Sequence, residues 1–368
     1  MSAIIVHVFG RTDVGRTREH NEDAFVVADL TRDNATLQPE VRTHDLGPRG
    51  TLFMVADGMG GAAAGEVASA MAIETVIEEM RARWAQSTST DPEAFAAAIR
   101  DAGSAANARI HKYAGEHPEH RGMGSTATIA GLLGDRLYVA QVGDSRAYLV
   151  RNGVASQITK DQSLVQKLVE AGELTAEEAE LSERRNIILQ ALGPEARVKV
   201  DLTTQQIRRG DTLVLCSDGL SGQVKADAIA ATVLAEPDLM ACCKALIDLA
   251  NNAGGPDNIT VIVARFDGDG LADVEDRDAV GHQTFRFSGS SRDTLSVDPD
   301  AATPPLGVPA IEPPGRPTKR ITPLTTPPLA EDPPPPPVTT KRNAGPLYAL
   351  IATAGVVLAA VYAFLYRK

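Results

Sequence analysis

The chain has few cysteines and no excess of basic residues. Its only cysteines, Cys216, Cys242 and Cys243, have no CxxC spacing, which argues against a structural zinc site or a disulfide framework and favours a reducing, cytosolic compartment. Among 368 residues, 36 lysines and arginines stand against 48 aspartates and glutamates, for a net charge of -12. Because nucleic-acid binding depends on a basic surface, no nucleic-acid partner is expected.

Two further signals are missing. The N-terminal MSAIIVHVFG has no basic start followed by a long apolar stretch, so no secretory signal peptide is predicted and these residues indicate a first strand instead. No Gly-Lys-Ser or Gly-Lys-Thr occurs, which excludes a Walker P-loop.

The character of the sequence changes twice along the chain. Residues 1–267 alternate apolar runs, helical patterns and turns, which predicts a folded domain. Residues 268–342 are rich in proline and hold more than half of the 23 prolines of the chain. Because proline removes backbone donors and few large apolar residues accompany it, this segment is predicted to be a disordered linker.

Residues 347–366 are uncharged, and a run of 20 residues is long enough to cross a bilayer core of about 30 Å as a helix. Basic pairs flank the run, and tyrosines lie near its ends, where aromatic rings favour the membrane interface. A buried core helix is the alternative, but after a disordered linker it would have nothing to pack against. We therefore predict a single-pass membrane anchor, with the folded domain on the cytosolic side of the plasma (inner) membrane.

Apolar runs predict eight strands in the folded domain. They are Ile4–Val8, Ala24–Val27, Leu52–Ala56, Thr126–Leu133, Leu137–Val142, Ala147–Val150, Thr212–Cys216 and Ile259–Phe266. Apolar residues at helical spacing predict helices over Ile73–Trp84 and Phe95–Tyr113, with a later pair over Asp227–Leu234 and Leu239–Leu249. Strands in direct succession favour antiparallel pairing, so the expected class is α+β rather than a doubly wound parallel sheet.

Four aspartates stand beside the ends of apolar strands. Asp57, Asp144 and Asp218 each follow a strand and lie next to glycine, and Asp257 precedes one. Ordinary turns would explain any single case, but four such cases together with the acidic Asn21–Asp23 indicate a shared site. Converging carboxylates repel one another unless a cation lies among them. An all-oxygen ligand set selects magnesium or manganese.

Two such cations could hold a hydroxide in line with a phosphorus atom. The non-reacting phosphate oxygens would need a cationic partner, and Arg18, four residues before Glu22, is the candidate because guanidinium binds phosphate bidentately. A surface arginine is the alternative for this residue.

The glycine-rich stretch after Asp57 raises a competing hypothesis. Gly58, Gly60 and Ala63 fit a dinucleotide-binding fingerprint, and Glu78 falls near the position of a ribose ligand. However, Asp57 would place a negative charge beside the pyrophosphate, and two helices follow this strand instead of a βαβ unit. The dinucleotide hypothesis is therefore disfavoured.

Five segments, in order, resemble the motifs of the PPM-type (type 2C) metal-dependent protein serine/threonine phosphatases. They are TDVGRTREHNEDAF, VADGMGGAAAGEVAS, GMGSTATIAGLLGDRLYVAQVGDSRAYLVRNG, CSDGLSG and GGPDNITVIV. The resemblance covers roughly residues 5 to 267. It implies a four-layer α-β-β-α sandwich of two antiparallel sheets flanked by helices, with a binuclear manganese or magnesium centre between the sheets.

The resemblance also implies roles for individual residues of the first metal site. Asp57 would bridge both metals, and the carbonyl of Gly58 would bind one of them. Asp218 and Asp257 would complete the ligands of the first metal.

At the second metal, Glu22 and Asp23 would act directly or through water, while Arg18 would hold the phosphate. A third metal would lie near Asp144 and share Asp218.

Three departures from the family pattern affect the expected chemistry. Met59 stands where many eukaryotic relatives have a histidine proposed as the acid for the leaving alcohol, although many bacterial members share DGMGG. Gln162 and the pair Ser182-Glu183 replace residues usual in the flap, which is expected over residues 158–193 with helices over Leu164–Ala171 and Ala176–Leu181. These changes put substrate preference in question and leave every expected metal ligand in place.

The sequence thus predicts a bacterial-type phosphatase that hydrolyses phosphoserine and phosphothreonine by direct attack of a metal-bound hydroxide. Its expected partners are phosphorylated proteins, such as a serine/threonine kinase and its targets, and the membrane through the C-terminal helix. The alternative is a phosphoprotein-binding module that grips the phosphate without cleaving it.

Overall fold

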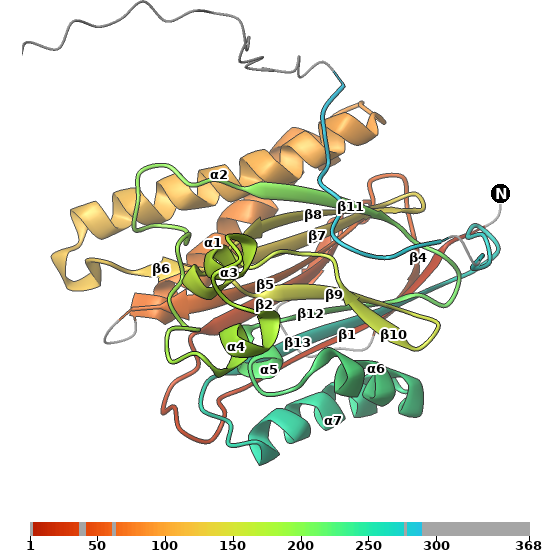
Figure 1. Cartoon of the computed structure of the whole chain (residues 1–368). Helices are drawn as coiled ribbons and strands as arrows, with labels where there is room; N and C mark the ends of the chain where they lie inside the picture. The colour runs from red at the N-terminus through yellow and green to blue at the C-terminus, as the bar shows by residue number, and fades with distance from the viewer. Residues whose placement is uncertain (1–2, 37–41, 61–63, 276–277, 289–368) are drawn as a thin grey trace, which may run out of the picture. The chain divides into compact units, whose positions relative to one another are not determined.

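A computed structural model describes residues 3–36, 42–60, 64–275 and 278–288 (Figure 1). The chain divides into two compact units, Met1–Thr294 and Leu295–Lys368, and all described residues belong to the first. The predicted membrane span at 347–366 and most of the predicted linker lie outside the described residues. Within the described ranges, no helix is both long enough and apolar enough to cross a membrane.

One antiparallel sheet has seven strands, in the order β11-β8-β7-β5-β2-β3, with the short β6 beside β5. The strands are β2 (Asp23–Asp29), β3 (Asn34–Thr36), β5 (Thr51–Met59), β6 (Gly124–Ser125), β7 (Ala127–Leu133), β8 (Arg136–Val142) and β11 (Asp201–Gln206). The central strand β5 is buried along nearly its whole length, which explains why its sequence is a continuous apolar run rather than an alternating one.

The second antiparallel sheet has six strands, in the order β10-β9-β12-β13-β1-β4. They are β1 (Ile5–Asp13), β4 (Arg42–Asp45), β9 (Arg146–Arg151), β10 (Val154–Gln157), β12 (Thr212–Cys216) and β13 (Ile259–Asp267).

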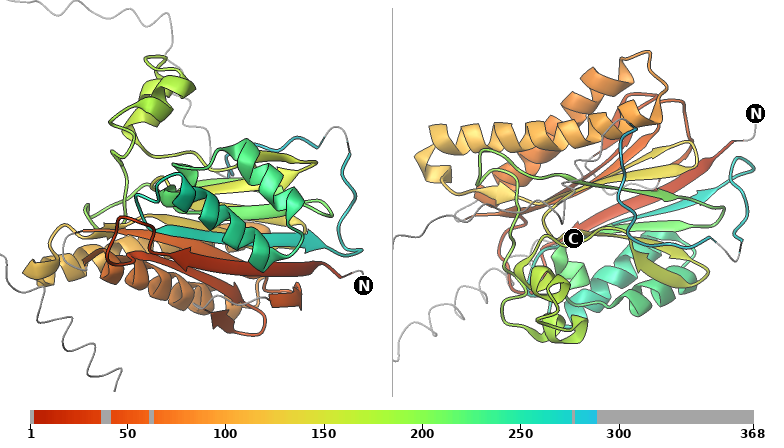
Figure 2. Two further views of the ribbon diagram at one scale, coloured as in Figure 1. Left: turned by 90° about the horizontal axis from the view of Figure 1, so that it is seen from below. Right: turned by 45° about the horizontal axis from the view of Figure 1, so that its top comes forward.

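Helices cover the outer face of each sheet (Figures 1 and 2). On the seven-stranded sheet lie α1 (Ala64–Met80), which continues into the π-helical turn η1 (Arg81–Ala85), and α2 (Pro92–Glu116). On the other sheet lie α6 (Ala226–Ala235) and α7 (Leu239–Asn252), near the short α5 (Asp218–Ser221). The remaining helices are η2 (Pro118–His120), α3 (Leu164–Glu170) and α4 (Ala176–Leu181). The pair α3 and α4 projects from the body in the left view of Figure 2.

Three apolar clusters lie between the successive layers. Along β5 the side chains alternate, with Phe53 and Val55 in the cluster between the sheets and Met54 and Ala56 in the cluster beneath α1 and α2. This two-residue period places one strand in two cores at once. The structure confirms the α+β class with two antiparallel sheets and flanking helices.

All eight predicted strands and the main predicted helices are present. Sequence analysis missed β3, β4, β6, β10 and β11, which are short or lie toward the sheet edges, and also α5 and η2. Strand β11 stands at the end of the seven-stranded sheet, and its sequence, DLTTQQ, is mostly polar. The period-two apolar signal is weak in such a strand.

Residues 278–288, hereafter the strap, pack on the folded unit instead of forming the start of a linker. The backbone N–H of Phe285 donates to the carbonyl of Leu202 in β11 at 2.8 Å, and its ring meets Tyr138 edge-on, with 5.5 Å between centroids. Arg208 pairs with Asp278 at 2.7 Å. Residues 278–288, which the prediction placed in a disordered linker, thus pack on the folded unit, and the rest of the predicted linker after Ser288 lies outside the described residues.

Candidate active site

Two neighbouring strands of the seven-stranded sheet bring acidic side chains to one place. Asp23 in β2 lies directly opposite Asp57 in β5, and directly opposite residues project from the same face of a sheet. The next pair is joined through the backbone, because the N–H of Gly58 donates to the carbonyl of Glu22 at 3.1 Å. The predicted residues Glu22, Asp23, Asp57 and Gly58 are thus brought together.

The six-stranded sheet supplies two more aspartates. Asp218 is the first residue of α5, directly after β12, and Asp257 stands just before β13. Burial raises the pKa of Asp218, and the groups that act on it include Asp257 from the same sheet and Asp57 from the other. Residues from the two sheets therefore contribute to one acidic cluster.

Arg18 lies at the edge of this cluster. Its Nη2 donates to Asp257 Oδ2 at 2.8 Å, and the two side chains are 47% and 32% exposed. The guanidinium is therefore next to the aspartates and still open to a ligand from solvent. One ion pair leaves further N–H groups of the guanidinium for other acceptors.

Asp144 comes from the turn between β8 and β9. It is 7% exposed, and the charges that act on it include those of Asp218 and Asp161. The neighbouring Arg146 forms a forked ion pair with Asp161, with Nη2 to Oδ2 at 2.7 Å. Its positive charge is therefore shared between Asp161 and Asp144. Asp144 is thus a buried acid at the side of the cluster where Asp218 lies.

Burial, with repulsion from neighbouring acids, raises the pKa values of Asp23, Asp57 and Asp144. Burial raises the pKa of Asp23 to about 7 and that of Asp144 to about 7. The pKa of Asp57 is raised well above its usual range, first by burial and then by the charges of Asp23, Asp218, Asp144 and Asp257. A cation within the cluster would oppose each of these effects.

Three buried carboxylate oxygens have no hydrogen-bond partner in the described structure. They are Oδ1 of Asp23, Asp144 and Asp218. No group of three or more His, Cys, Asp or Glu side chains in the described ranges is arranged to hold a metal ion as it stands. The donor chemistry nevertheless fits hard divalent cations, because the set consists of oxygen atoms and the unpartnered oxygens are buried.

Sequence analysis missed the polar residues that hold these acids in place. Asn258 accepts from the N–H of Glu22 through Oδ1 at 2.8 Å and donates from Nδ2 to the carbonyl of His20 at 2.9 Å. Ser217 donates to Asp23 Oδ2 at 2.8 Å. Both residues adjoin predicted ligands in the sequence, but partners about 200 residues distant cannot be read from a local motif.

Thr126, also missed, fixes the backbone of Asp57. Its Oγ1 accepts from the N–H of Asp57 at 2.9 Å, and its own N–H donates to the carbonyl of Asp57 at 2.8 Å. Its hydroxyl is also 2.8 Å from that of Ser145. Thr126 therefore ties the end of β5 to the turn that carries Asp144.

The glycines after Asp57 allow close packing rather than forming a dinucleotide cradle. A Cβ on Gly58 would lie 2.1 Å from the carbonyl oxygen of Gly65, and a Cβ on Gly65 would lie 2.6 Å from Glu22 Oε1. The start of α1 thus presses on the Glu22 side chain. The space beside these glycines is filled by protein, which supports the rejection of the dinucleotide hypothesis.

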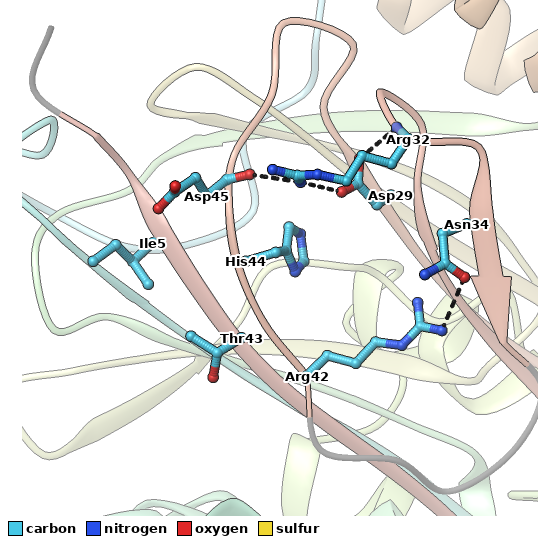
Figure 3. A pocket seen from close by; sticks show the side chains of 8 residues that line it. All are labelled: Ile5, Asp29, Arg32, Asn34, Arg42, Thr43, His44 and Asp45. Carbon is cyan, nitrogen blue, oxygen red and sulfur yellow. Dashed lines mark hydrogen bonds and ion pairs between the residues drawn. The ribbon is translucent and has the colours of Figure 1, made fainter.

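A cavity of about 660 Å³ lies elsewhere, among β1, β2, β3 and β4 (Figure 3). Its lining includes two arginines that have partners: Arg32 pairs with Asp29 at 2.5 Å, and Arg42 donates to Asn34 at 3.2 Å. None of its lining residues is a predicted site residue. The acidic cluster, and not this cavity, carries the predicted chemistry.

Comparisons with known proteins identify a family and several relatives of this chain. The protein phosphatase 2C family matches residues 31–254. The serine/threonine phosphatase stp of Listeria monocytogenes is 37% identical over 262 residues, covering 71% of this chain and 96% of the relative. The serine/threonine protein phosphatase PstP of Mycobacterium tuberculosis is 38% identical over 263 residues, covering 71% of this chain and 45% of that longer protein.

The fold is also shared with a solved structure. The catalytic domain of the serine/threonine protein phosphatase PstP, in complex with two manganese ions, superposes with a TM-score of 0.58 at 35% identity, covering 72% of this chain and 99% of that one. The chain therefore belongs to the protein phosphatase 2C (PPM) family. It is a metal-dependent protein serine/threonine phosphatase, as its sequence motifs indicated.

Proposed function

We propose that the acidic cluster hydrolyses phosphoserine and phosphothreonine of proteins directly, without a phosphoenzyme. The observation that carries this proposal is the set of unpartnered, buried carboxylate oxygens on Asp23, Asp144 and Asp218. Crowded aspartates with buried, unpartnered carboxylate oxygens are costly unless cations are bound there. Binding of cations in the cluster would offset this unfavourable free energy.

Two or three Mn²⁺ or Mg²⁺ ions would be held by residues from both sheets. When bound, such ions supply a reactive hydroxide at neutral pH and neutralise the charge of the phosphate. Asp57, the carbonyl of Gly58, Asp218 and Asp257 would hold the first, with Asp57 shared. Asp57 lies opposite Asp23, and the charges of Asp218 and Asp257 also act on it, which supports this shared role.

Glu22 and Asp23 would serve the second ion, directly or through water. Asp144 would serve a third, weaker site together with Asp218. The unpartnered Oδ1 atoms of both Asp144 and Asp218 support that assignment.

Arg18 would hold the substrate phosphate. Its guanidinium is half exposed beside Asp257, so a phosphate that enters the cluster from solvent would meet it. The leaving alcohol needs a proton, which the thioether of Met59 cannot donate. Water or another group would have to supply that proton.

The proposed setting is the cytosolic face of the plasma membrane. The catalytic unit, here extended through the strap, would be joined by the proline-rich segment to a membrane helix over residues 347–366. A tether of this composition would allow the phosphatase to reach membrane-proximal phosphoproteins, such as a serine/threonine kinase and its targets.

The decisive experiment compares hydrolysis with binding in the full chain. The purified protein is treated with chelator and supplied with a phosphothreonine peptide or p-nitrophenyl phosphate, with and without added manganese. We expect hydrolysis only with manganese, and much slower hydrolysis by the Asp57→Asn variant at saturating manganese. Peptide binding without turnover in the wild-type chain would favour the phosphoprotein-binding module instead.

A further inference from the structure

Gln162, one of the departures from the family pattern, connects the Asp144 turn to strand β11. The backbone N–H of Gly143 donates to Gln162 Oε1 at 2.9 Å, and the backbone N–H of Gln162 donates to the carbonyl of Gly143 at 2.9 Å. Nε2 of the same side chain donates to Asp201 Oδ2 at 2.8 Å. Gln162 thus uses both ends of its amide and is only 7% exposed.

These partners fix the orientation of the amide. The N–H of Gly143 requires an acceptor, and the Asp201 carboxylate requires a donor. Burial alone would raise the pKa of Asp201, but its bonds with Lys199 and Gln162 hold that pKa below the usual value. Asp201 is therefore a charged acceptor, and a carboxylate in place of the Gln162 amide would face it with a like charge.

The opposite side of the turn rests on Thr126. Gly143 has a φ of +99°, and a Cβ at this position would lie 2.7 Å from the Thr126 methyl carbon. The turn is therefore held between Thr126 and Gln162. Thr126 also binds the backbone of Asp57, so the two contacts together set where Asp144 lies relative to Asp57.

Strand β11, to which Gln162 is bound, is itself held on both sides. It pairs with β8 from Asp201 to Gln206. On its other edge, the strap contributes the bond from Phe285 to Leu202 and accepts one from Thr204 to the carbonyl of Gln283 at 2.9 Å. Asp201 is thus a firm point of attachment.

We propose that Gln162 is a positioning residue, which through Gly143 holds the Asp144 carboxylate toward Asp218. The significance of that position rests on the proposed function, in which Asp144 and Asp218 share an ion. Gln162 itself touches neither substrate nor the reacting atoms. The Gln162 side chain, which replaces the usual flap residue, thus accepts a hydrogen bond from Gly143 and donates one to Asp201.

The test exchanges donor and acceptor across the bridge. Gln162→Glu retains an acceptor for Gly143 but opposes Asp201, whereas Gln162→Glu with Asp201→Asn restores one donor and one acceptor. We expect the single variant to lose about tenfold in turnover on a phosphopeptide, the scale of one broken buried hydrogen bond to a charge. The double variant should recover most of that loss.

A matched control is available on the same strand. Gln206, at the far end of β11, donates through Nε2 to Asp135 at 2.7 Å on an exposed surface. Gln206→Glu places a carboxylate beside Asp135 and away from Asp144, with Arg208, which donates to Gln206 Oε1 at 3.3 Å, as a further partner. We expect this variant to leave turnover unchanged.

Two readouts separate positioning from general stability. In chelator-treated full-length protein, amide hydrogen exchange over residues 141–146 should quicken in Gln162→Glu and slow again in the double variant. In an Asp144→Ala background, Gln162→Glu should cause little further loss of turnover, because the group it positions is gone.

Full turnover in Gln162→Glu, or an equal loss with and without Asp144, would overturn the proposal. So would failure of Asp201→Asn to restore both exchange and turnover. If the wild-type chain does not hydrolyse phosphopeptides, the proposed function fails, whereas hydrogen exchange still tests the bridge in the metal-free protein.

Discussion

Asp23 and Asp57 occupy directly opposite positions on β2 and β5, so the sheet itself brings two carboxyl groups together. Both are raised in pKa chiefly by burial, and the charge of Asp23 adds to the effect on Asp57. Like charges directly opposite one another destabilise a sheet. The register of these two strands thus favours cation binding at the expense of metal-free stability.

The first prediction separates these two consequences. In the metal-free protein the buried Asp57 carboxyl group must either take up a proton or carry a charge beside other acids. Asp57→Asn removes this cost, so the metal-free protein should become more stable, by about 1 kcal/mol or more. The same change weakens the hold on cations that make the nucleophile, so turnover should fall by about two orders of magnitude or more. Chemical unfolding with chelator and hydrolysis at saturating manganese measure the two effects.

Asp269→Asn is the matched control for this variant. Asp269 is 89% exposed, and its ion pair with Arg209 is long, at 3.7 Å. Neither stability nor turnover should therefore change in this variant. Near-normal turnover by Asp57→Asn would remove Asp57 from the site, and lower metal-free stability would contradict the repulsion argument.

The second prediction concerns the pH dependence of the metal-free protein. An aspartate in an unfolded chain releases its proton near pH 3.9, whereas burial holds the pKa of Asp23 and Asp144 at about 7 in the folded chain. Between these values the folded state binds more protons, so its stability falls as pH rises. The slope contributed by each group is up to about 1.4 kcal/mol per pH unit.

Unfolding by urea at pH 5 and pH 7.5 measures this slope. His44 and His282, whose pKa values are lowered mainly by burial, act in the opposite direction. Subtraction of the slope of a variant that carries both Asp23→Asn and Asp144→Asn, which retains both histidines, isolates the contribution of these two acids. Added manganese should flatten the decline with pH, and a wild-type slope equal to that of the double variant would contradict the prediction.

The sequence indicated the acids of this site better than the groups that support them. Asp57 lies near the end of β5 and Asp218 just after β12. Both strands are buried on both faces and have long apolar runs that are easily recognised, so the positions of these two acids could be predicted. Asn258 and Thr126 act on partners across the fold, and no spacing within the chain reveals such contacts. The strap was missed for a similar reason. Phe285 and Phe287 pack on Tyr138 and the apolar cluster beneath α2, and these contacts join segments far apart in the sequence.

The third prediction tests Thr126 as a support. Thr126→Val keeps the shape but removes the acceptor for the buried N–H of Asp57, which should cost about 1–3 kcal/mol of stability and lower turnover. Thr126→Ser keeps the hydroxyl and should retain most of the activity. A Thr126→Val variant as stable and as active as Thr126→Ser would show that the hydrogen bond to the N–H of Asp57 contributes little.

The fourth prediction tests the packing of the strap. Phe285→Ala removes a partly buried ring from Tyr138 and Phe287, and we expect a loss of about 1–3 kcal/mol in the free energy of unfolding. Leu234→Ala, at a side chain 65% exposed on α6, should cost much less. If the two variants unfold at the same denaturant concentration, the strap does not stabilise the folded unit.

The last prediction compares two places to end the chain. Ending after Lys341 removes the predicted anchor but keeps the strap, so the protein should leave the membrane fraction and retain full activity on p-nitrophenyl phosphate. Ending after Asp267 also removes the partners of Arg208 and Leu202, and uncovers an edge of β11 that can pair with other chains. This shorter protein should unfold at lower temperature and aggregate more readily. Fractionation, thermal unfolding and light scattering distinguish the outcomes. Equal stability of the two shortened chains would show that the folded unit ends at β13, and a full-length chain that stays soluble would refute the anchor.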